Sequence, residues 1–278
     1  MAVRRFMQVD VFSPVPAEGN GLAVVLESDG LTDQDLARFA AWTNLAETTF
    51  LYPPADARAD YKVRIMTPSR EMLFAGHPTL GSCMAWLHAG GVPKEPGIVR
   101  QECGIGIVEI DVSGAEPAFA APPTKVRVMS DANRETIMAT LEIDPADVLL
   151  SAELENGPVW QAFQMRDAAA VLALDGGRVR WPDFKALGFI GAHPPGHDID
   201  FEVRMLAPSS GMLEDPITGS LNAALAQWMA GNGRLTEPVC IAQGTTINRS
   251  GRVAIRPDGE RIFIGGAVHI LIEGTVDL

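Results

Sequence analysis

Short apolar runs rich in β-branched residues alternate along the chain with segments of helical periodicity. The apolar runs are bounded by turn residues and predict strands over 7–12, 23–26, 48–52, 63–66, 98–101, 106–112, 159–165, 201–206, 253–256, 262–265 and 268–272. Apolar residues at helical spacing predict helices over 32–43, where Thr32 can act as the N-cap, and over 130–141, with shorter helices near 145–150, 168–174 and 182–187. Because strands and helices follow in no strict βαβ alternation, this order favours an α+β architecture.

One supersecondary unit occurs twice in the sequence. The run VRIMTPS at 63–69 returns as VRMLAPS at 203–209, and the Gly-Ser pair at 81–82 returns at 219–220. Each copy predicts a strand, a turn and an apolar helix that the Gly-Ser pair opens; the second helix has an apolar stripe over 221–229. The two copies are 140 positions apart in the sequence, which indicates two duplicated halves. We expect these halves to pack about a pseudo-two-fold axis with a ligand cleft between them.

The proline-rich stretch 117–123 predicts the connection between the halves. We therefore expect one domain over 1–118 and a second over 124–266.

The composition limits the partners. The 35 acidic against 22 basic residues give a net charge of -13, which repels phosphate backbones and anionic lipid heads, so we expect neither nucleic acid nor membrane as a partner. Three widely spaced cysteines, Cys83, Cys103 and Cys240, fit neither a disulfide framework nor a zinc cluster. With no targeting signal and no long apolar segment, we expect a cytoplasmic protein.

The candidate catalytic residues lie near the predicted helix starts. A helix N-terminus binds anions, so two such starts facing each other predict a site for a small carboxylic acid. His77 and Asp215 each precede a Gly-Ser pair and so occupy nearly equivalent places in the two halves. They are candidate catalytic residues; the alternative is that each caps its helix or braces a turn beside proline.

Glu47 is the candidate base. It lies between Leu45 and Phe50, and partly apolar surroundings raise the pKa of a carboxylate toward a useful range. The alternative reading of the spacing is a surface glutamate.

Five blocks spread along the whole chain resemble the PhzF phenazine-biosynthesis family of isomerases. These blocks are GNGLAVV at 19–25, NLAETTFL at 44–51, VRIMTPSREMLFAGHPTLGS at 63–82, LEDPITGSLNAAL at 213–225, and a terminal QG followed by GGAVHILIEGTV. The resemblance implies a diaminopimelate-epimerase-like fold with two pseudo-symmetric domains, each a sheet wrapped around a central helix, starting near Pro78 and Ile217. It further implies that the last strand, about 267–278, returns to the first domain, and that the protein is a homodimer without metal or organic cofactor.

The resemblance also assigns roles to residues. Glu47 matches the family's proton-transferring glutamate, His77 the histidine of GHPTLG and Asp215 the aspartate of EDPxTGS. The same blocks imply that the substrate is bound by Asn20, Gly76, Thr218, Gly219 and Ser220. The chain has Ala46 where serine is common in the family, and it departs from the commoner pattern at Gly21 and at Leu221-Asn222. The last two departures lie beside the expected cleft and bear on the identity of the substrate more than on the fold or the base.

The expected function is therefore a cofactor-independent isomerase in which Glu47 moves a carbon-bound proton within a small unsaturated or cyclic acid. Two alternatives remain open at this point. A binding protein could keep the fold without catalysis, and an amino-acid epimerase or racemase could share it. The second is disfavoured because such enzymes use a pair of cysteines, and no cysteine lies in GHPTLG or EDPITGS.

Overall fold

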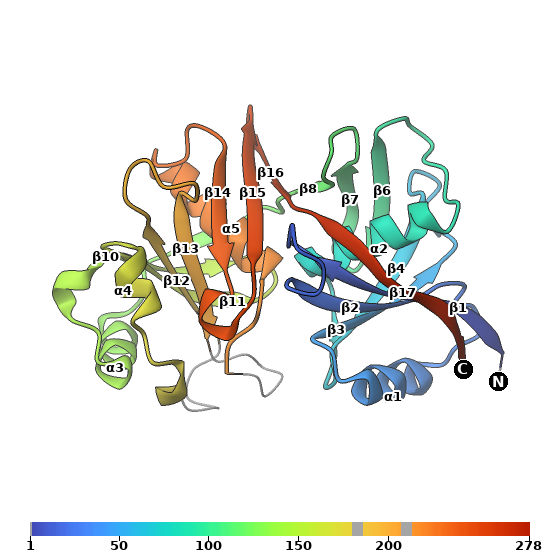
Figure 1. Cartoon of the computed structure of the whole chain (residues 1–278), viewed down its shortest axis with the longest axis horizontal. Coiled ribbons are helices and arrows are strands. Elements are labelled where there is room, and N and C mark those ends of the chain that lie inside the picture. The colour runs from blue at the N-terminus through green and yellow to red at the C-terminus, as the bar shows by residue number, and fades with distance from the viewer. Residues whose placement is uncertain (1, 180–185, 207–212) are drawn as a thin grey trace. The chain divides into compact units, whose positions relative to one another are not determined.

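The computed structural model describes residues 2–179, 186–206 and 213–278. The chain forms two compact units: unit 1 comprises 1–120 and 265–278, and unit 2 comprises 121–264. Figure 1 labels their elements. No helix in the described part of the chain is both long enough and apolar enough to cross a membrane.

Unit 1 is built on one mixed sheet. Its strands are β1 (Val3–Val11), β2 (Asn20–Val25), β3 (Glu47–Tyr52), β4 (Tyr61–Met66), β5 (Glu71–Met72), β6 (Ile98–Cys103), β7 (Gly106–Asp111), β8 (Ala118–Ala120) and β17 (Val268–Asp277). They pair in the order β17–β1–β2–β3–β4–β6–β7–β8, with β5 also on β4. The pairs β2–β3 and β4–β6 are parallel and the others are antiparallel. The C-terminal strand β17 thus completes this sheet beside β1.

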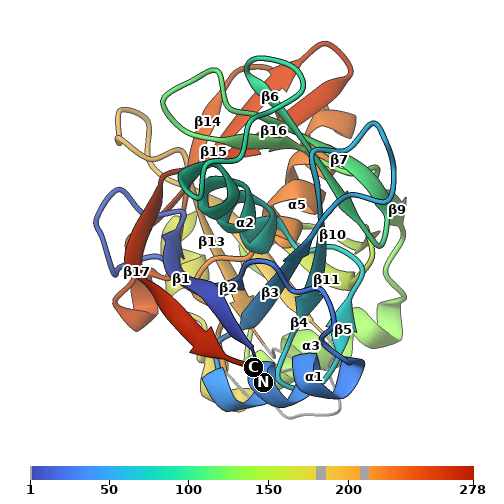
Figure 2. The ribbon, with the colours of Figure 1, turned by 90° about the vertical axis from the view of Figure 1, so that its right-hand side faces the viewer.

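Two helices cover the two faces of the unit 1 sheet. Helix α1 (Asp33–Thr43) begins with a capping box between Thr32 and Asp35 and packs Leu36 and Phe39 against Val25 and Phe50 of the strands. Helix α2 (Gly76–His88) lies against the other face, where Gly81 touches side chains of β1 and β2 (Figure 2). Helix α2 is therefore the central helix of unit 1.

Unit 2 repeats this plan. Its strands are β9 (Lys125–Arg127), β10 (Val148–Glu155), β11 (Val159–Met165), β12 (Leu187–Ala192), β13 (Phe201–Leu206), β14 (Val239–Gln243), β15 (Gly251–Asp258) and β16 (Arg261–Gly265). The order β9–β10–β11–β12–β13–β14–β15 has parallel pairs at β11–β12 and β13–β14. From β10 to β15 the sequence of parallel and antiparallel pairs is the same as from β1 to β7, which is the structural trace of a duplication.

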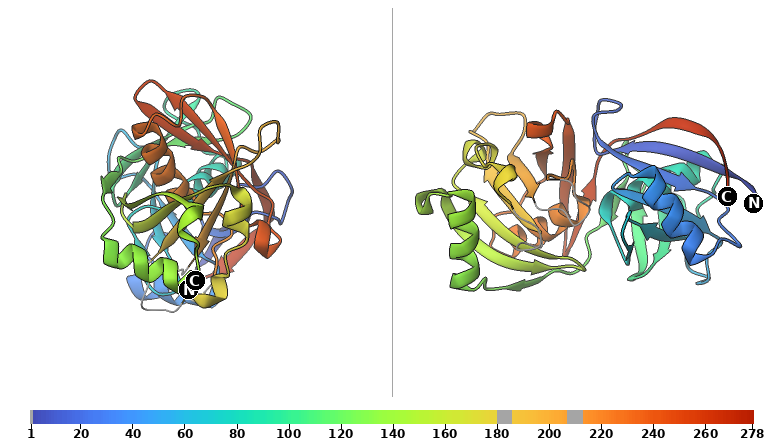
Figure 3. Two further views of the ribbon diagram at one scale, coloured as in Figure 1. Left: turned by 90° about the vertical axis from the view of Figure 1, so that its left-hand side faces the viewer. Right: turned by 90° about the horizontal axis from the view of Figure 1, so that it is seen from below.

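The helices of unit 2 also form two layers. Helices α3 (Asp131–Leu141) and α4 (Ala168–Leu172) pack in one cluster with Leu187 and Phe189 of β12. Residue Gly188, between them, points to the opposite face, where a Cβ would meet Leu221 of α5 (Gly219–Gly231). Figure 3 shows α3 in yellow-green and α5 in orange on either side of the strands. Short 3₁₀ helices span Pro145–Asp147, Gly176–Arg178 and Thr245–Ile247.

The α+β prediction is confirmed, but several local predictions are wrong. Instead of a helix over 145–150, the 3₁₀ turn ends at Asp147 and Val148 opens β10, because the aliphatic residues that follow pair with β11. The predicted helix over 168–174 ends at Leu172. Within the stretch 117–123, residues 118–120 form β8. The predicted helix over 182–187 and the repeat residues 207–209 fall almost wholly outside the described residues; Leu187 itself opens β12.

The prediction that a Gly-Ser pair opens each central helix is wrong for the first helix, whereas the starts near Pro78 and Ile217 that the resemblance implied agree with the structure to within two residues. Helix α2 begins at Gly76, so the Gly-Ser pair at 81–82 lies inside it, whereas α5 does begin at Gly219. Proline at position 78 is accepted in the first turn because its missing N–H is not needed there. His77 is the second residue of α2, and the second residue of α5 is Ser220. Asp215 lies four residues before the start of α5, so it does not occupy the position of His77 relative to the helix.

Candidate functional site

In unit 1 the structure brings together Glu47 and His77, which lie 30 positions apart in the sequence. Atom Nε2 of His77 lies 3.4 Å from Oε2 of Glu47, and the two side chains are 4% and 14% exposed. A carboxylate and an imidazole thus meet in surroundings that largely exclude water.

Local structure explains the position of each of these side chains. Helix α1 ends at Asn44, which adopts the left-handed conformation (φ 53°), so the chain turns directly into β3 and Glu47 becomes its first residue. Because β3 pairs in parallel with β2, Glu47 lies beside Leu22. His77 is the second residue of α2, so the base candidate comes from the sheet and the histidine from the central helix.

Asn20 completes this cluster. Its Nδ2 lies 3.4 Å from Nδ1 of His77. The turn before it depends on Gly19, whose N–H donates to Asp10 at 3.0 Å and where a Cβ would lie 2.4 Å from the carbonyl oxygen of Val11. Any larger residue would push the turn away from β1 and Asn20 away from the histidine.

Burial sets the charge of His77. Loss of hydration lowers the pKa of His77 from 6.5 to about 3, so the ring is neutral at pH 7. With the Asn20 amide donating to Nδ1, the ring carries its proton on Nε2, the nitrogen that faces Glu47. Within the described part of the chain, Nε2 makes no hydrogen bond. The site therefore offers a carboxylate base next to an uncommitted N–H donor.

In unit 2 the candidate residues lie in and after the loop that precedes α5. Asp215 is 9% exposed and accepts a hydrogen bond at 2.5 Å from the hydroxyl of Thr218. Gly219 and Ser220 form the first turn of the helix and are both buried. The first-turn N–H groups of a helix have no partner within it and act as donors.

Among the residues that the structure describes, neither central helix has a side-chain cap at its start. The N-cap residues Ala75 of α2 and Thr218 of α5 make no capping hydrogen bond, whereas Thr32 and Ser130 cap α1 and α3. The donors at Gly76 and at Gly219 are thus not covered by the usual side-chain acceptor, a property suited to an anion.

One functional candidate was missed by the sequence analysis. Gln243 at the end of β14 is fully buried and bonds to Asp215 and Thr218. A glutamine in the otherwise apolar run Val239–Gln243 is the signal that could have drawn attention to it.

The described residues bear on two further kinds of site, a metal-binding cluster and a reactive thiol. No group of three or more His, Cys, Asp or Glu side chains in the described ranges is placed to hold a metal ion. Burial raises the pKa of the thiols of Cys83 and Cys103, which disfavours the reactive thiolate form at neutral pH.

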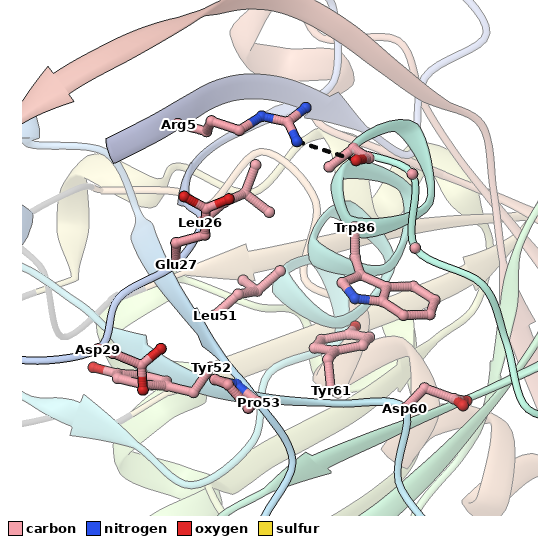
Figure 4. A pocket seen from close by; sticks show the side chains of 13 residues that line it. Arg5, Leu26, Glu27, Asp29, Leu51, Tyr52, Pro53, Asp60, Tyr61 and Trp86 are labelled. Carbon is pink, nitrogen blue, oxygen red and sulfur yellow. Dashed lines mark hydrogen bonds between the residues drawn. The ribbon is translucent and has the colours of Figure 1, made fainter. Parts of the chain in front are cut away.

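A pocket of about 330 Å³ opens elsewhere in unit 1, at the C-terminal end of α2 (Figure 4). It is lined by Arg5, Leu26, Glu27, Asp29, Leu51, Tyr52, Pro53, Asp60, Tyr61, Trp86, Ala89, Gly90 and Gly91. Trp86 stacks on Tyr61, and Arg5 donates to the carbonyl of Ala89 at 3.0 Å. At roughly 1.5 Å per residue, Trp86 is about 14 Å along the helix from His77, so this pocket is separate from the Glu47–His77 site.

Comparison with known structures assigns the fold. A crystal structure of a PhzF-family phenazine biosynthesis protein from Bacillus anthracis matches with a TM-score of 0.82 at 20% identity over 100% of both chains. A hydroxyproline epimerase from Agrobacterium vitis, solved with bound trans-4-OH-L-proline, matches with a TM-score of 0.65 at 14% identity, covering 99% of this chain and 92% of that chain. The predicted diaminopimelate-epimerase-like fold is confirmed.

Sequence comparison assigns the family. The pattern of the phenazine biosynthesis-like proteins (PhzC-PhzF) matches residues 9–274. Antisense-enhancing sequence 1 of Schizosaccharomyces pombe is 32% identical over 99% of both proteins. Trans-2,3-dihydro-3-hydroxyanthranilate isomerase of Pseudomonas fluorescens is 29% identical over 99% of this chain and 100% of that protein. The chain belongs to the phenazine biosynthesis-like (PhzC-PhzF) family, whose named relatives include isomerases, as the sequence blocks predicted.

Proposed function

We propose that the protein is a PhzF-type isomerase that moves a carbon-bound proton within a small unsaturated or cyclic carboxylic acid. Glu47 is the acid–base group, and the reaction uses neither a metal nor an organic cofactor. The observation that carries this proposal is the approach of Glu47 to a neutral His77 in surroundings largely closed to water.

The chemistry follows from the two side chains. The Glu47 carboxylate takes a proton from carbon, and the electron pair left behind spreads into the conjugated system and the carboxylate of the substrate. The Glu47 carboxylic acid then returns the proton to a different carbon, which moves the double bond and restores the base. The N–H at Nε2 of His77 and the first-turn N–H groups of α2 stabilise the charge that develops.

A neutral histidine suits this role better than a charged one. An imidazolium 3.4 Å from Oε2 would form an ion pair that makes the carboxylate a weaker base. A neutral ring leaves Glu47 basic and still supplies one hydrogen-bond donor.

We assign the candidate residues of unit 2 to the same reaction. Asp215 accepts a hydrogen bond from a polar group of the substrate. The backbone donors of Gly219 and Ser220 hold its carboxylate, as does Gly76 in unit 1, and Thr218 holds Asp215. Asn20 keeps the ring of His77 in its tautomer.

Two comparisons support the substrate class. The Pseudomonas fluorescens relative is named for a dihydro-hydroxyanthranilate, and the Agrobacterium vitis epimerase holds a hydroxyproline. Both are small cyclic amino acids with a carboxylate.

The test is solvent deuterium incorporation. The protein is incubated in deuterated water with trans-2,3-dihydro-3-hydroxyanthranilate and with a panel of small cyclic and unsaturated acids, and the products are followed by NMR. We expect deuterium at one carbon together with a shifted double bond. Inversion at a stereocentre would make the protein an epimerase. Binding without exchange would make it a ligand-binding protein; the Schizosaccharomyces pombe relative has a name that is not enzymatic.

Glu47→Gln tests the base. We expect a loss of about 100- to 10,000-fold in turnover, with binding of the acid retained. Glu95→Gln is the matched control, because Glu95 is an exposed residue of unit 1 that pairs with Arg100, and it should leave turnover unchanged. Turnover that survives in Glu47→Gln while binding is lost would refute the assignment.

We also propose that the protein is a homodimer. Light scattering should then give about twice the 29.7 kDa of one chain, and a mass of one chain would refute this.

A further inference from the structure

The side chain of Gln243 is the centre of a buried hydrogen-bond network in unit 2. It is 0% exposed. Its Nε2 donates to the backbone oxygen of Asp215 at 3.2 Å and to Oγ1 of Thr218 at 3.0 Å. Its Oε1 accepts from the backbone N–H of Thr218 at 3.1 Å and from Nδ2 of Asn222 at 2.8 Å. All four hydrogen bonds go to the start of α5 and the loop before it.

The partners fix the orientation of this amide. The backbone N–H of Thr218 can only donate and the backbone carbonyl of Asp215 can only accept, so Oε1 must face the first and Nε2 the second. Oγ1 of Thr218 then accepts from Nε2 and gives its single proton to Oδ2 of Asp215. The result is a directed relay from Gln243 through Thr218 to the Asp215 carboxylate.

The backbone near Gln243 also lies in close contact with the loop before α5. A Cβ at Gly244, which has φ +89°, would lie 2.7 Å from the carbonyl oxygen of Pro216, and a Cβ at Gly251 would lie 2.3 Å from Cγ1 of Ile217. The middle of the loop over 214–218 therefore lies directly against Gly244, the residue after β14, and against Gly251 of β15.

The start of the same loop is held by a buried ion pair. Glu214 pairs with Arg204 at 2.7 Å, both side chains being 5% exposed, and accepts a hydrogen bond from Thr246 at 2.8 Å. Because both ends of the loop are fixed by side chains with few alternative positions, the Asp215 carboxylate has little freedom of its own.

Unit 1 contains a similar hydrogen bond from a buried glutamine to a threonine, but there the threonine does not donate to a carboxylate. Gln101 at β6 is 0% exposed and donates to Oγ1 of Thr79 in α2 at 3.0 Å. There the proton of the threonine goes to the backbone carbonyl of Ala75. In both units a strand glutamine thus binds a threonine near the start of the central helix: Thr79 lies inside α2, Thr218 is the N-cap of α5, and only Thr218 donates to a carboxylate, that of Asp215.

We propose that Gln243 is a positioning residue that fixes the carboxylate of Asp215 through Thr218. This inference rests on the proposed function only for the role of Asp215 in turnover. The effect of Gln243 on the loop that carries this carboxylate can be measured without a substrate.

The activity test compares Gln243→Met with Gln101→Met. Both substitutions remove a fully buried amide of the same size, so both cost stability, and far-ultraviolet circular dichroism verifies that each variant is folded. We expect Gln243→Met to lower kcat/KM about 10- to 100-fold, the range for losing hydrogen bonds that act on a charged group. Gln101→Met should stay within about threefold of wild type. Equal losses in the two variants would overturn the proposal.

A double-mutant cycle separates positioning from general damage. Thr218→Val should match the loss in Gln243→Met, and the double variant should be no worse than either single variant, because both remove the same relay. Thr218→Ser keeps the hydroxyl and should restore most of the activity. Multiplied losses in the double variant, or no rescue by serine, would mean that Gln243 does not act through Thr218.

Hydrogen exchange tests the inference if no acid is turned over. Mass spectrometry should show faster amide exchange over 214–218 in Gln243→Met, and in Gln243→Glu as a second variant, but not in Gln101→Met. Unchanged exchange in this loop would refute the positioning role. Failure of Glu47→Gln to reduce turnover would refute only the proposed function, so the two failures are distinguishable.

Discussion

The neutral state of His77 is the feature of the site most open to a direct physical test, and the perturbation is a fall in pH. The pKa of the imidazole is 6.5 when unburied, as in an unfolded chain, and about 3 when folded. Below pH 6.5 the unfolded chain binds a proton that the folded protein does not, so the free energy of unfolding must fall as the pH falls.

The size of the effect follows from the same two values. Each pH unit below 6.5 costs about 1.4 kcal/mol, so between pH 6.5 and 5 His77 alone should remove about 2 kcal/mol from the free energy of unfolding. The loss continues until the pH reaches about 3. Since a domain has a net stability of about 5–15 kcal/mol, this term is large enough to measure.

The assay is urea unfolding at pH 7 and pH 5 for the wild type and for His77→Gln, which has no group that titrates in this range. The other titratable groups are shared, so the wild type should lose about 2 kcal/mol more than the variant between the two pH values. NMR of the histidine ring protons gives an independent check, because the His77 signal should not titrate between pH 8 and 5. A midpoint near 6.5, or equal losses in the two proteins, would mean that burial does not hinder protonation of His77, and a midpoint above 6.5 would mean that the ring is charged and paired with Glu47; each result would refute the neutral-histidine reasoning.

Two further predictions concern the scaffold that holds the site. Gly81→Ala places a Cβ 2.6 Å from Cδ2 of Leu22 and should lower the free energy of unfolding by about 1–3 kcal/mol; Gly231→Ala at the open end of α5, where nothing lies within 4 Å, should raise it by about 0.5–1 kcal/mol. Equal urea midpoints for the two variants would contradict the close packing of α2. Arg204→Met leaves Glu214 buried without its partner and should cost about 3–5 kcal/mol. Arg64→Met breaks two exposed pairs, with Asp33 and with Glu71, and should cost about 1 kcal/mol or less for each pair. Calorimetry that ranks the two arginines in the opposite order would show that burial does not control their contributions.

The two arginines also show how the duplicated units have diverged. Arg64 and Arg204 occupy the same place in the repeated strand, and each pairs with a glutamate in the chain that leads to the central helix. In unit 1 this pair is partly open to water and the proposed catalytic carboxylate, Glu47, comes from β3. In unit 2 the pair is buried beside Asp215. A common framework thus carries different candidate residues in each unit.

The sequence alone determined the features that depend on neighbouring residues and on repetition. The strand at 159–165, the cap at Thr32 and the repeat at 63–69 and 203–209 can all be read from side-chain type and spacing, because each reflects short-range preference. The sequence blocks also predicted the family and the fold, and they nominated Glu47, His77 and Asp215.

The tertiary structure decided what depends on contacts between distant segments. Helix α2 begins at Gly76 and not at the Gly-Ser pair, because packing against β1 and β2 buries the whole segment and overrides the weak local signal. The meeting of Glu47 with His77 follows from the parallel pairing of β2 and β3. The contacts behind the role proposed for Gln243 exist only once β14 lies against the start of α5. Hydrogen-bond partners far apart in sequence leave no periodic pattern in the sequence.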